Sequence, residues 1–269
     1  MYQISVQPEE IEKLEPGAFG GKIHVVDRPG PELEHAIKYL SRQKIIGFDT
    51  ESRPSFTPDQ PKYGVSLLQL SGAKEAFLFR IKMTGLDERL CRIMASDKII
   101  KVGAAVHDDL RGLQRHRAFE PSNFIDLQKI VWEYGIKDKS VKKMSAIILG
   151  VRISKTQQLS NWEAETLSEP QQLYAATDAW VCREMYNKLM KSEKNPLPEE
   201  ILHPQPAAKP EIPKQEEGQA NAGAAPENPV RKSARKRRRN EWRRRFYQKK
   251  YGKRKTGKAG NGKDNTEKR

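Results

Sequence analysis

The sequence IIGFDTES, residues 45–52, gives the clearest indication of how this chain folds. It begins with an apolar run that is typical of a buried strand, and it ends with two carboxylates, Asp49 and Glu51. Because side chains alternate between the two faces of a strand, residues two apart lie on the same face. We therefore expect Asp49 and Glu51 to lie on one side of a sheet, where both can reach a shared ion.

Three more candidate site residues occur further along the chain. Tyr174 and Asp178 in LYAATDAW are four residues apart in a segment with helical spacing, so they share a helix face. Asp109 in KVGAAVHDDLRGL lies at the start of a helix that follows an apolar strand. A strand end, a helix start and a helix face can converge at one edge of a sheet, where sites of α/β proteins commonly form.

This set of side chains contains four carboxylates and no histidine or cysteine partner. A set of ligands made up of carboxylate oxygens, without nitrogen or sulfur, suits Mg²⁺ and Mn²⁺. Four carboxylates packed together would raise one another's pKa values, and divalent cations remove that penalty. A single D-x-E motif on a strand is more often a solvated face or a salt-bridge partner, so only the combination predicts a metal site.

The rest of the patterned region alternates short strands with helices, which predicts an α/β fold with a mixed sheet covered by helices. The strands between residues 45 and 79 are expected to form a meander with short loops. Segment 124–135 fits either a strand that runs into a helix or a helix alone. The expected strands are 22–26, 45–51, 65–70, 76–79 and 98–103. The expected helices are 31–43, 86–96, 107–117, 139–150 and a last helix that begins near Pro170, with Leu173, Ala176, Trp180 and Met185 among its core residues.

The three motifs, taken in order, are similar to a known family. DTE after an apolar strand, then KVGAAVHDDLRGL, then LSNWEAETLSEPQQLYAATDAWVCREMY closely resemble the DEDD superfamily of 3′–5′ exonucleases. The Y-x-x-x-D ending resembles its DEDDy branch, which includes ribonuclease D and the exonuclease domain of the Werner syndrome helicase. The resemblance covers roughly residues 25–190 and implies a ribonuclease H-like mixed sheet flanked by helices.

The resemblance implies ligands for two Mg²⁺ or Mn²⁺ ions at four positions: Asp49, Glu51, Asp109 and Asp178. Asp49 would bridge both ions, and Tyr174 would orient the attacking water, since a phenol with a pKa near 10 stays protonated. The reaction would release nucleoside 5′-monophosphates from the 3′ end of RNA or DNA. Asp108 is the alternative to Asp109, and it would otherwise cap the helix. The competing interpretation is a catalytically silent, nucleic-acid-binding adaptor with the same fold.

Several further side chains are candidates for contacts around this site. Lys155 and Trp162 lie in SKTQQLSNWE before the last helix, and similar stretches in the family lie near the substrate. Trp162 could stack on a base or a sugar, or it could be a packing anchor. Asp126 could support the site or cap a strand end. Ser66 and Gln69 could face the cleft, but the sequence does not fix the register of their strand.

The net charge of +15 is distributed unevenly over the 269 residues. Residues 1–200 carry a net charge of +1, whereas residues 201–269 carry +14. Residues 195–230 are rich in Pro, Ala, Glu and Gln and have few large apolar side chains, which predicts a disordered linker. The expected organisation is a leader (1–20), an exonuclease domain (21–194), this linker (195–230) and a basic nucleic-acid-binding tail (231–269).

The tail sequence RKSARKRRRNEWRRRFYQKKYGKRK interleaves aromatic with basic residues. A charge run alone is usually solvated, but aromatic stacking adds to phosphate attraction in proteins that bind single strands. The tail therefore predicts a nucleic-acid partner. The candidate contact residues are Arg237, Arg238, Arg239, Trp242 and Phe246.

Cysteine usage and the N-terminal sequence bear on the cellular compartment. Cys91 and Cys182 are expected to be buried thiols in a reducing compartment. The N-terminal sequence lacks the pattern of a signal peptide, and no apolar run approaches the roughly 20 residues that span a bilayer. We therefore expect a cytoplasmic protein with no membrane partner, which would associate with the nucleoid in a bacterium or enter the nucleus in a eukaryote.

Deletion of residues 231–269 should weaken nucleic-acid binding and flatten its salt dependence, because the tail carries most of the excess positive charge. Turnover at saturating substrate should be retained. Fluorescence anisotropy at several salt concentrations, with the full chain beside the truncated chain, measures both quantities. An unchanged affinity and salt slope would contradict the role of the tail.

Overall fold

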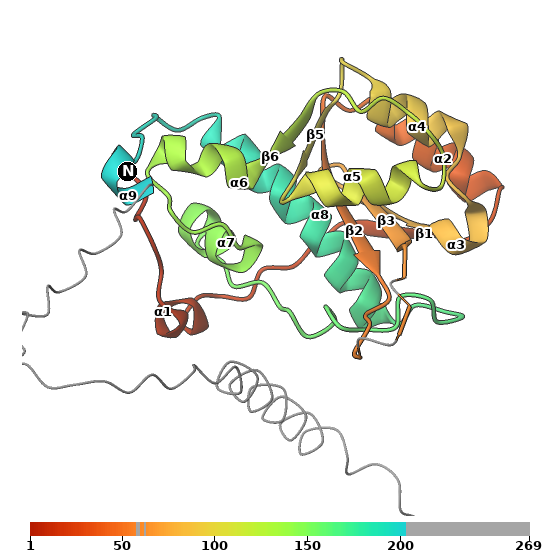
Figure 1. Ribbon diagram of the computed structural model, residues 1–269, viewed down its shortest axis with the longest axis horizontal. Coiled ribbons are helices and arrows are strands. Elements are labelled where there is room, and N and C mark those ends of the chain that lie inside the picture. The colour runs from red at the N-terminus through yellow and green to blue at the C-terminus, as the bar shows by residue number, and fades with distance from the viewer. Residues whose placement is uncertain (58–59, 62, 203–269) are drawn as a thin grey trace, which may run out of the picture. The chain divides into compact units, whose positions relative to one another are not determined.

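The computed structural model describes residues 1–57, 60–61 and 63–202. A six-stranded mixed sheet lies at its centre, with the strand order β1-β4-β3-β2-β5-β6 (Figure 1). The strands β2, β3 and β4 pair antiparallel in a meander, whereas β1–β4, β2–β5 and β5–β6 are parallel pairs. The strands are β1 (Lys22–Val26), β2 (Ile45–Ser52), β3 (Val65–Ser71), β4 (Glu75–Arg80), β5 (Ile100–Gly103) and β6 (Phe124–Asp126). This mixed sheet confirms the fold class predicted from the sequence.

The central strand β2 presents a different kind of residue to each side of the sheet. Ile46 and Phe48 are fully buried in the larger hydrophobic core. Gly47 and Asp49 alternate with them and lie on the opposite face. The connection from β2 to β3 spans residues 53–64 and is longer than the short loop expected from the sequence.

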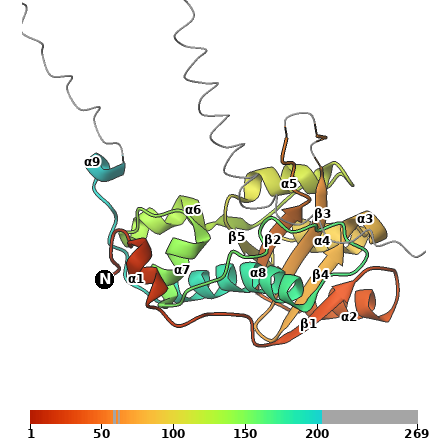
Figure 2. The same cartoon turned by 90° about the horizontal axis from the view of Figure 1, so that it is seen from below.

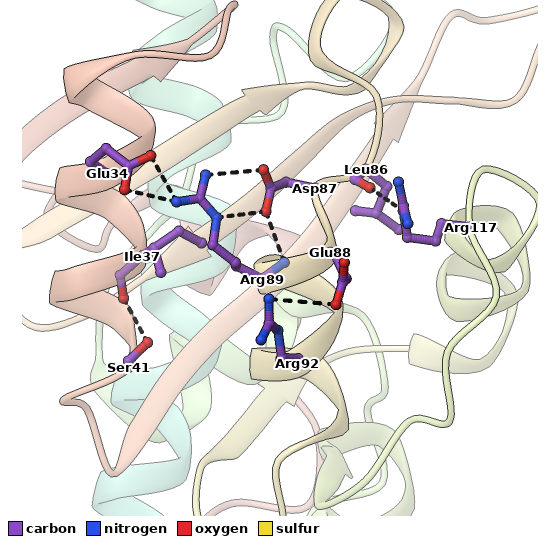
Figure 3. A network of polar contacts seen from close by, with 9 residues as sticks. All are labelled: Glu34, Ile37, Ser41, Leu86, Asp87, Glu88, Arg89, Arg92 and Arg117. Atoms are coloured by element: carbon purple, nitrogen blue, oxygen red, sulfur yellow. Dashed lines mark hydrogen bonds and ion pairs between the residues drawn. The ribbon is translucent and has the colours of Figure 1, made fainter.

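Three helices and a short turn of helix pack against the face that carries Ile46 and Phe48. They are α2 (Pro31–Leu40), α3 (Ile81–Thr84), α4 (Glu88–Ala95) and α5 (Val106–Gln114). Arg89 ties α4 to α2, since its Nη1 donates to both carboxylate oxygens of Glu34 at 2.7 Å (Figure 3). The same guanidinium also donates to Asp87, which caps the N-terminus of α4. This ion-pair network joins the two helices at the surface.

The long helix α8 (Glu169–Leu189) covers the opposite face of the sheet, so the strands lie between α8 and α5 (Figure 2). Ser168 caps its N-terminus and forms a capping box with Gln171. Among the residues expected in its core, Ala176 and Met185 are fully buried and Trp180 is partly buried. Leu173 is 40% exposed, so its assignment to the core was wrong.

The remaining helices pack at the β6 end of the sheet. They are α6 (Leu127–Ile130), the 3₁₀ helix η1 (Val131–Tyr134), α7 (Val141–Leu149) and α9 (Glu199–Leu202). Segment 124–135 is thus a strand that runs into a helix, which was one of the two alternatives. Helix α7 ends at Gly150 in the left-handed conformation (φ 75°), as the sequence predicts, and packs against α8.

The first 20 residues pack against helices α7 and α8. Helix α1 (Pro8–Glu12) buries Ile11, which clusters with Val6 and Ala146. The Phe19 amide donates to Thr177 Oγ1 on α8 at 3.0 Å. The residues expected to form a leader therefore contribute to the core of the described part of the chain.

No helix within the described ranges has the length and apolar character that a membrane span requires.

Gly47→Ala should strongly destabilise the protein, because an added Cβ would overlap the Ala179 carbonyl oxygen and lie 2.5 Å from its carbonyl carbon. Backbone atoms cannot rotate away, so we expect a loss of at least about 3 kcal/mol, the upper part of the range for overpacked cores. Urea unfolding monitored by circular dichroism measures the change.

Gly20→Ala is the matched control, because a Cβ there has nothing within 4 Å. Its effect should stay within about 0.5 kcal/mol, as for an ordinary surface substitution. Equal stabilities of the two variants would contradict the close contact between β2 and α8.

Candidate active site

The close contact between β2 and α8 brings carboxylates from the two elements together. Asp49 and Glu51 lie on the face of β2 that meets α8, and Asp178 lies one helical turn after Tyr174 on α8. One carboxylate oxygen from each of Asp49, Glu51 and Asp178 lies within 4.8 Å of the others. The structure thus brings together both pairs that the sequence places on common faces.

Asp109 approaches this triplet from the start of α5. The chain enters that helix through Ala105, whose left-handed conformation (φ 60°) turns the backbone sharply after β5. Asp109 Oδ1 accepts a hydrogen bond of 2.6 Å from Thr50 Oγ1, whereas Asp108 is exposed. Asp109 is therefore the member of the pair that faces the site, although it does not belong to the 4.8 Å triplet.

Asp126 holds the start of α5 in place. Its Oδ1 accepts from the Ala105 amide at 3.0 Å and from the Gln128 amide at 3.1 Å. The bond from Gln128 caps α6, whereas the bond from Ala105 fixes the turn that leads to Asp109. The cap left open by the sequence is therefore present, and the second bond adds support to the turn before Asp109.

The four carboxylates have raised pKa values because they lie close together in a half-buried site. Burial raises the pKa of Asp49 well above its ordinary value, and the charges of Asp178, Glu51 and Asp109 add to this effect. Burial, with the charges of Asp178 and Asp109, raises the pKa of Glu51 to about 9. Burial also raises the pKa values of Asp109 and Asp178 to about 6. The site thus holds more negative charge than its protein surroundings neutralise.

Tyr174 remains a neutral phenol next to these acids. Burial raises its pKa well above 10, and the charges of Asp178 and Glu51 act in the same direction. Its hydroxyl hydrogen-bonds to Asp178, which lowers the pKa of that carboxyl. Tyr174 can therefore donate and orient, but it cannot act as an ionised base.

Lys155 and Trp162 in the segment before α8 differ in their surroundings. Lys155 is exposed, and its charge lowers the pKa of Asp178, so it lies at the rim of the site. Trp162 is fully buried, and its ring centroid lies 6.0 Å from that of Tyr174. The expectation that Trp162 stacks on a substrate base is corrected here, because none of its surface is accessible.

The register of β3 settles the positions of its two polar candidates. Gln69 pairs with Asp49 and lies on the same face, where its side chain is fully buried. Its amide has no hydrogen-bond partner among the described residues. Ser66 instead donates to Glu163 at 3.2 Å.

Two residues that the sequence reasoning missed are essential to the geometry. Gly47 permits the backbone contact with Ala179, and Thr50 holds Asp109. A glycine inside an otherwise apolar strand was the available signal for a close backbone approach. No local pattern indicated Thr50. The candidate contact residues of the tail lie outside the described residues.

The donor set of the site fits hard divalent cations. All four acidic groups offer oxygen ligands, and Mg²⁺ and Mn²⁺ favour carboxylate oxygens. A divalent ion would also compensate the charge that raises the pKa values of Asp49 and Glu51. The arrangement can therefore hold metal ions next to a neutral tyrosine.

Comparison with known proteins identifies curated relatives. An exonuclease 3′-5′ domain-containing protein 2 of Drosophila melanogaster is 35% identical over 153 residues, which cover 55% of this chain and 26% of that protein. Ribonuclease D of Gluconacetobacter diazotrophicus is 26% identical over 60% of this chain and 40% of the relative. The chain thus spans less than half the length of these relatives.

Solved structures share the fold. The exonuclease domain of Aedes aegypti Nibbler superimposes with a TM-score of 0.56 at 24% identity, covering 63% of this chain and 87% of that domain. Escherichia coli ribonuclease D superimposes with a TM-score of 0.55 at 23% identity, covering 64% of this chain and 44% of the ribonuclease D chain.

A protein-family model described as 3′-5′ exonuclease matches residues 28–193, which is more than half of the chain. The matched segment contains all four carboxylates and Tyr174, and it confirms the family resemblance inferred from the motifs. The chain belongs to the 3′–5′ exonuclease family.

Proposed function

We propose that this protein is a metal-dependent exonuclease that removes nucleoside 5′-monophosphates from the 3′ end of RNA or DNA. The observation that carries the proposal is the approach of Asp49, Glu51 and Asp178 to within 4.8 Å of one another, in a chain of the exonuclease family. Asp109 and Tyr174 flank this triplet and complete the set of residues that the motifs indicate.

Asp49, Glu51 and Asp178 are the proposed ligands of one Mg²⁺ or Mn²⁺ ion, and Asp49 with Asp109 those of a second. Such ions lower the pKa of a bound water and stabilise the oxygen that leaves the cleaved phosphodiester. The support for this assignment is the all-oxygen donor set and the unbalanced negative charge.

The protein residues have separate tasks in this proposal. Tyr174 stays protonated and orients the attacking water through its hydroxyl, which also hydrogen-bonds to Asp178. Thr50 keeps Asp109 pointed toward the site through its 2.6 Å hydrogen bond. Lys155, exposed at the rim, attracts a substrate phosphate by its charge.

The proposed substrate is either RNA or DNA. Among the solved neighbours, a Trypanosoma brucei ribonuclease D is described in complex with RNA U12. Among the curated relatives is DNA polymerase I of Aquifex aeolicus. Both polymers therefore belong in the first assay.

The full chain should shorten 5′-labelled RNA or DNA from the 3′ end in the presence of Mg²⁺ or Mn²⁺. Denaturing gels should show a ladder that EDTA abolishes, because metal removal leaves the carboxylates without their function. Asp49→Asn should reduce the rate at least about a hundredfold, more than the loss of a residue outside the ligand shell. Tight binding without any ladder would instead support the silent adaptor.

Asp108 and Asp109 provide a matched pair of adjacent carboxylates. Asp109→Asn should reduce the rate at least about a hundredfold, because this side chain faces the site through Thr50. Asp108→Asn should stay within about threefold, since its side chain is exposed and its charge acts on the site only from a distance. Equal losses in the two variants would contradict the assignment of Asp109.

The metal-free protein should lose stability as the pH rises. The pKa of Glu51 rises from 4.5 in the unfolded chain to about 9 in the folded protein, and the pKa of Asp178 rises from 3.8 to about 6. Protons on these groups therefore favour the folded state, and that contribution disappears as the pH passes from about 4 to about 9. Calorimetry in EDTA should show a falling Tm over this range, and saturating Mn²⁺ should restore it most at high pH.

Glu51→Gln is the control for this pH dependence, because it removes a carboxyl group whose pKa is raised to about 9. The variant should be more stable than the wild type at high pH without metal, and its Tm should depend less on pH. A steeper dependence in the variant would contradict the proposed charge repulsion.

A further inference from the structure

A second cluster of potential ligands lies on the other face of the sheet from the acidic site. It consists of His24 on the edge strand β1, His35 on α2 and Glu75 at the start of β4. His24 pairs in register with Phe77, and Glu75 lies two residues before Phe77 on the same face of β4. Helix α2 covers this corner and brings His35 over it.

The side-chain atoms of this cluster converge closely. His24 Nε2 lies 2.7 Å from Glu75 Oε2, and His35 Nε2 lies 2.6 Å from the same oxygen. The two imidazole centroids are 5.0 Å apart. One ligand atom from each of the three residues lies within 4.8 Å of the other two.

A fourth residue fixes the orientation of the buried histidine. His24 Nδ1 lies 2.8 Å from Glu32 Oε2, so the ring has a carboxylate at each nitrogen. When Nδ1 carries the proton and donates it to Glu32, the Nε2 lone pair faces the Glu75 carboxylate, which is repulsive. A cation bound at Nε2 removes this repulsion. A carboxylate that accepts from Nδ1–H while Nε2 faces a metal ion is a common arrangement around histidine metal ligands.

The surroundings give the cluster one rigid side and one open side. His24 is 5% exposed, and its ring stacks on Phe77 with centroids 4.8 Å apart and an interplanar angle of 13°. The side chain of His35, in contrast, is 44% exposed. The buried histidine thus provides a fixed ligand, and the exposed one leaves a path for an ion and a water molecule.

We propose that His24, His35 and Glu75 form a binding site for Zn²⁺ or a similar late first-row transition-metal ion, with Glu32 as the carboxylate that orients His24. Two imidazoles and one carboxylate suit such an ion, whereas the all-oxygen site on the other face suits Mg²⁺ or Mn²⁺. Water takes the fourth position at the exposed side. The site does not depend on nuclease activity.

Binding requires only a small rearrangement of these side chains. Tetrahedral ligands at the usual Zn–N and Zn–O distances are about 3.3 Å apart, somewhat more than the present 2.6 and 2.7 Å contacts. The exposed His35 and the partly exposed Glu75 side chains can supply this movement. The bound ion would join β1, β4 and α2, and so would pin the edge strand to the sheet and its covering helix.

The test is Zn²⁺ binding by the metal-free full chain, measured by isothermal titration calorimetry with excess Mg²⁺ present to occupy the acidic site. We expect one Zn²⁺ per chain, and a visible d–d spectrum typical of four-coordinate nitrogen and oxygen ligands when Co²⁺ replaces it. His35→Ala should weaken binding at least about a hundredfold, since it removes a direct ligand. This variant should fold, because His35 is exposed.

Glu32 and Glu34 on the same helix supply a matched control pair. Glu32→Gln should weaken Zn²⁺ binding by about 10- to 100-fold, because it removes the partner of His24 Nδ1. Glu34→Gln should leave Zn²⁺ affinity unchanged, since Glu34 pairs with Arg89 instead. Zn²⁺ should also raise the Tm of the wild type but not that of His35→Ala.

Two results would overturn the proposal. One is an absence of Zn²⁺ binding by the wild-type chain, which would make the cluster a hydrogen-bonded network that needs no metal ion. The other is an equal Zn²⁺ affinity of the wild type and His35→Ala, which would place the bound ion elsewhere.

Discussion

The close contact between the backbones of β2 and α8 fixes the arrangement of the sheet, the long helix and the acidic residues. At Gly47 the two elements approach so closely that no side chain fits between the strand and the Ala179 carbonyl. This approach sets the depth and the rotation of α8 over the sheet. Because Asp49 and Glu51 follow Gly47 on the same strand face, and Asp178 precedes Ala179, one contact determines how near these carboxylates come.

The same contact creates an electrostatic cost. Asp49 is surrounded by three other acids in a half-buried position, and every one of their charges raises its pKa. Nearby compensation is small: the Thr50 amide donates to Asp49, and the Lys155 charge acts on Asp178. The fold supplies the rigidity that keeps the acids together through buried apolar packing around α8 and through the capping box at Ser168. The site is thus fixed in geometry but unbalanced in charge, which is what the proposed binding of divalent cations requires.

The sequence predicted those parts of the structure that follow from local periodicity. The spacing of two on a strand and of four on a helix located Asp49 with Glu51 and Tyr174 with Asp178, because such spacings hold in any fold. Burial on a helix packed on several sides was harder to predict. Leu173 has helical core spacing but lies outside the contacts of α8 with the sheet, and it is exposed. Trp162 lies in an irregular segment, where no period indicates which way a side chain faces.

Contacts between distant segments were also beyond the sequence. The approach of Thr50 to Asp109 and that of His24 to Glu75 depend on strand order and register, which no local pattern reveals. The packing of residues 1–20 against α7 could not be predicted for the same reason. Val6 and Ile11 are buried by contact with Ala146, which lies far away in the sequence.

The two hydrogen bonds that Asp126 accepts have a consequence for how this chain can vary in evolution. One carboxylate oxygen ties the turn at Ala105 to the start of α6, so both ends of the intervening segment are anchored at the same point. Most of residues 115–123, between these anchors, are exposed. Insertions or deletions there would lengthen or shorten a closed surface loop without displacing either anchor. This loop is therefore a place where related chains can acquire new surface features while the acidic residue at the head of α5 keeps its position.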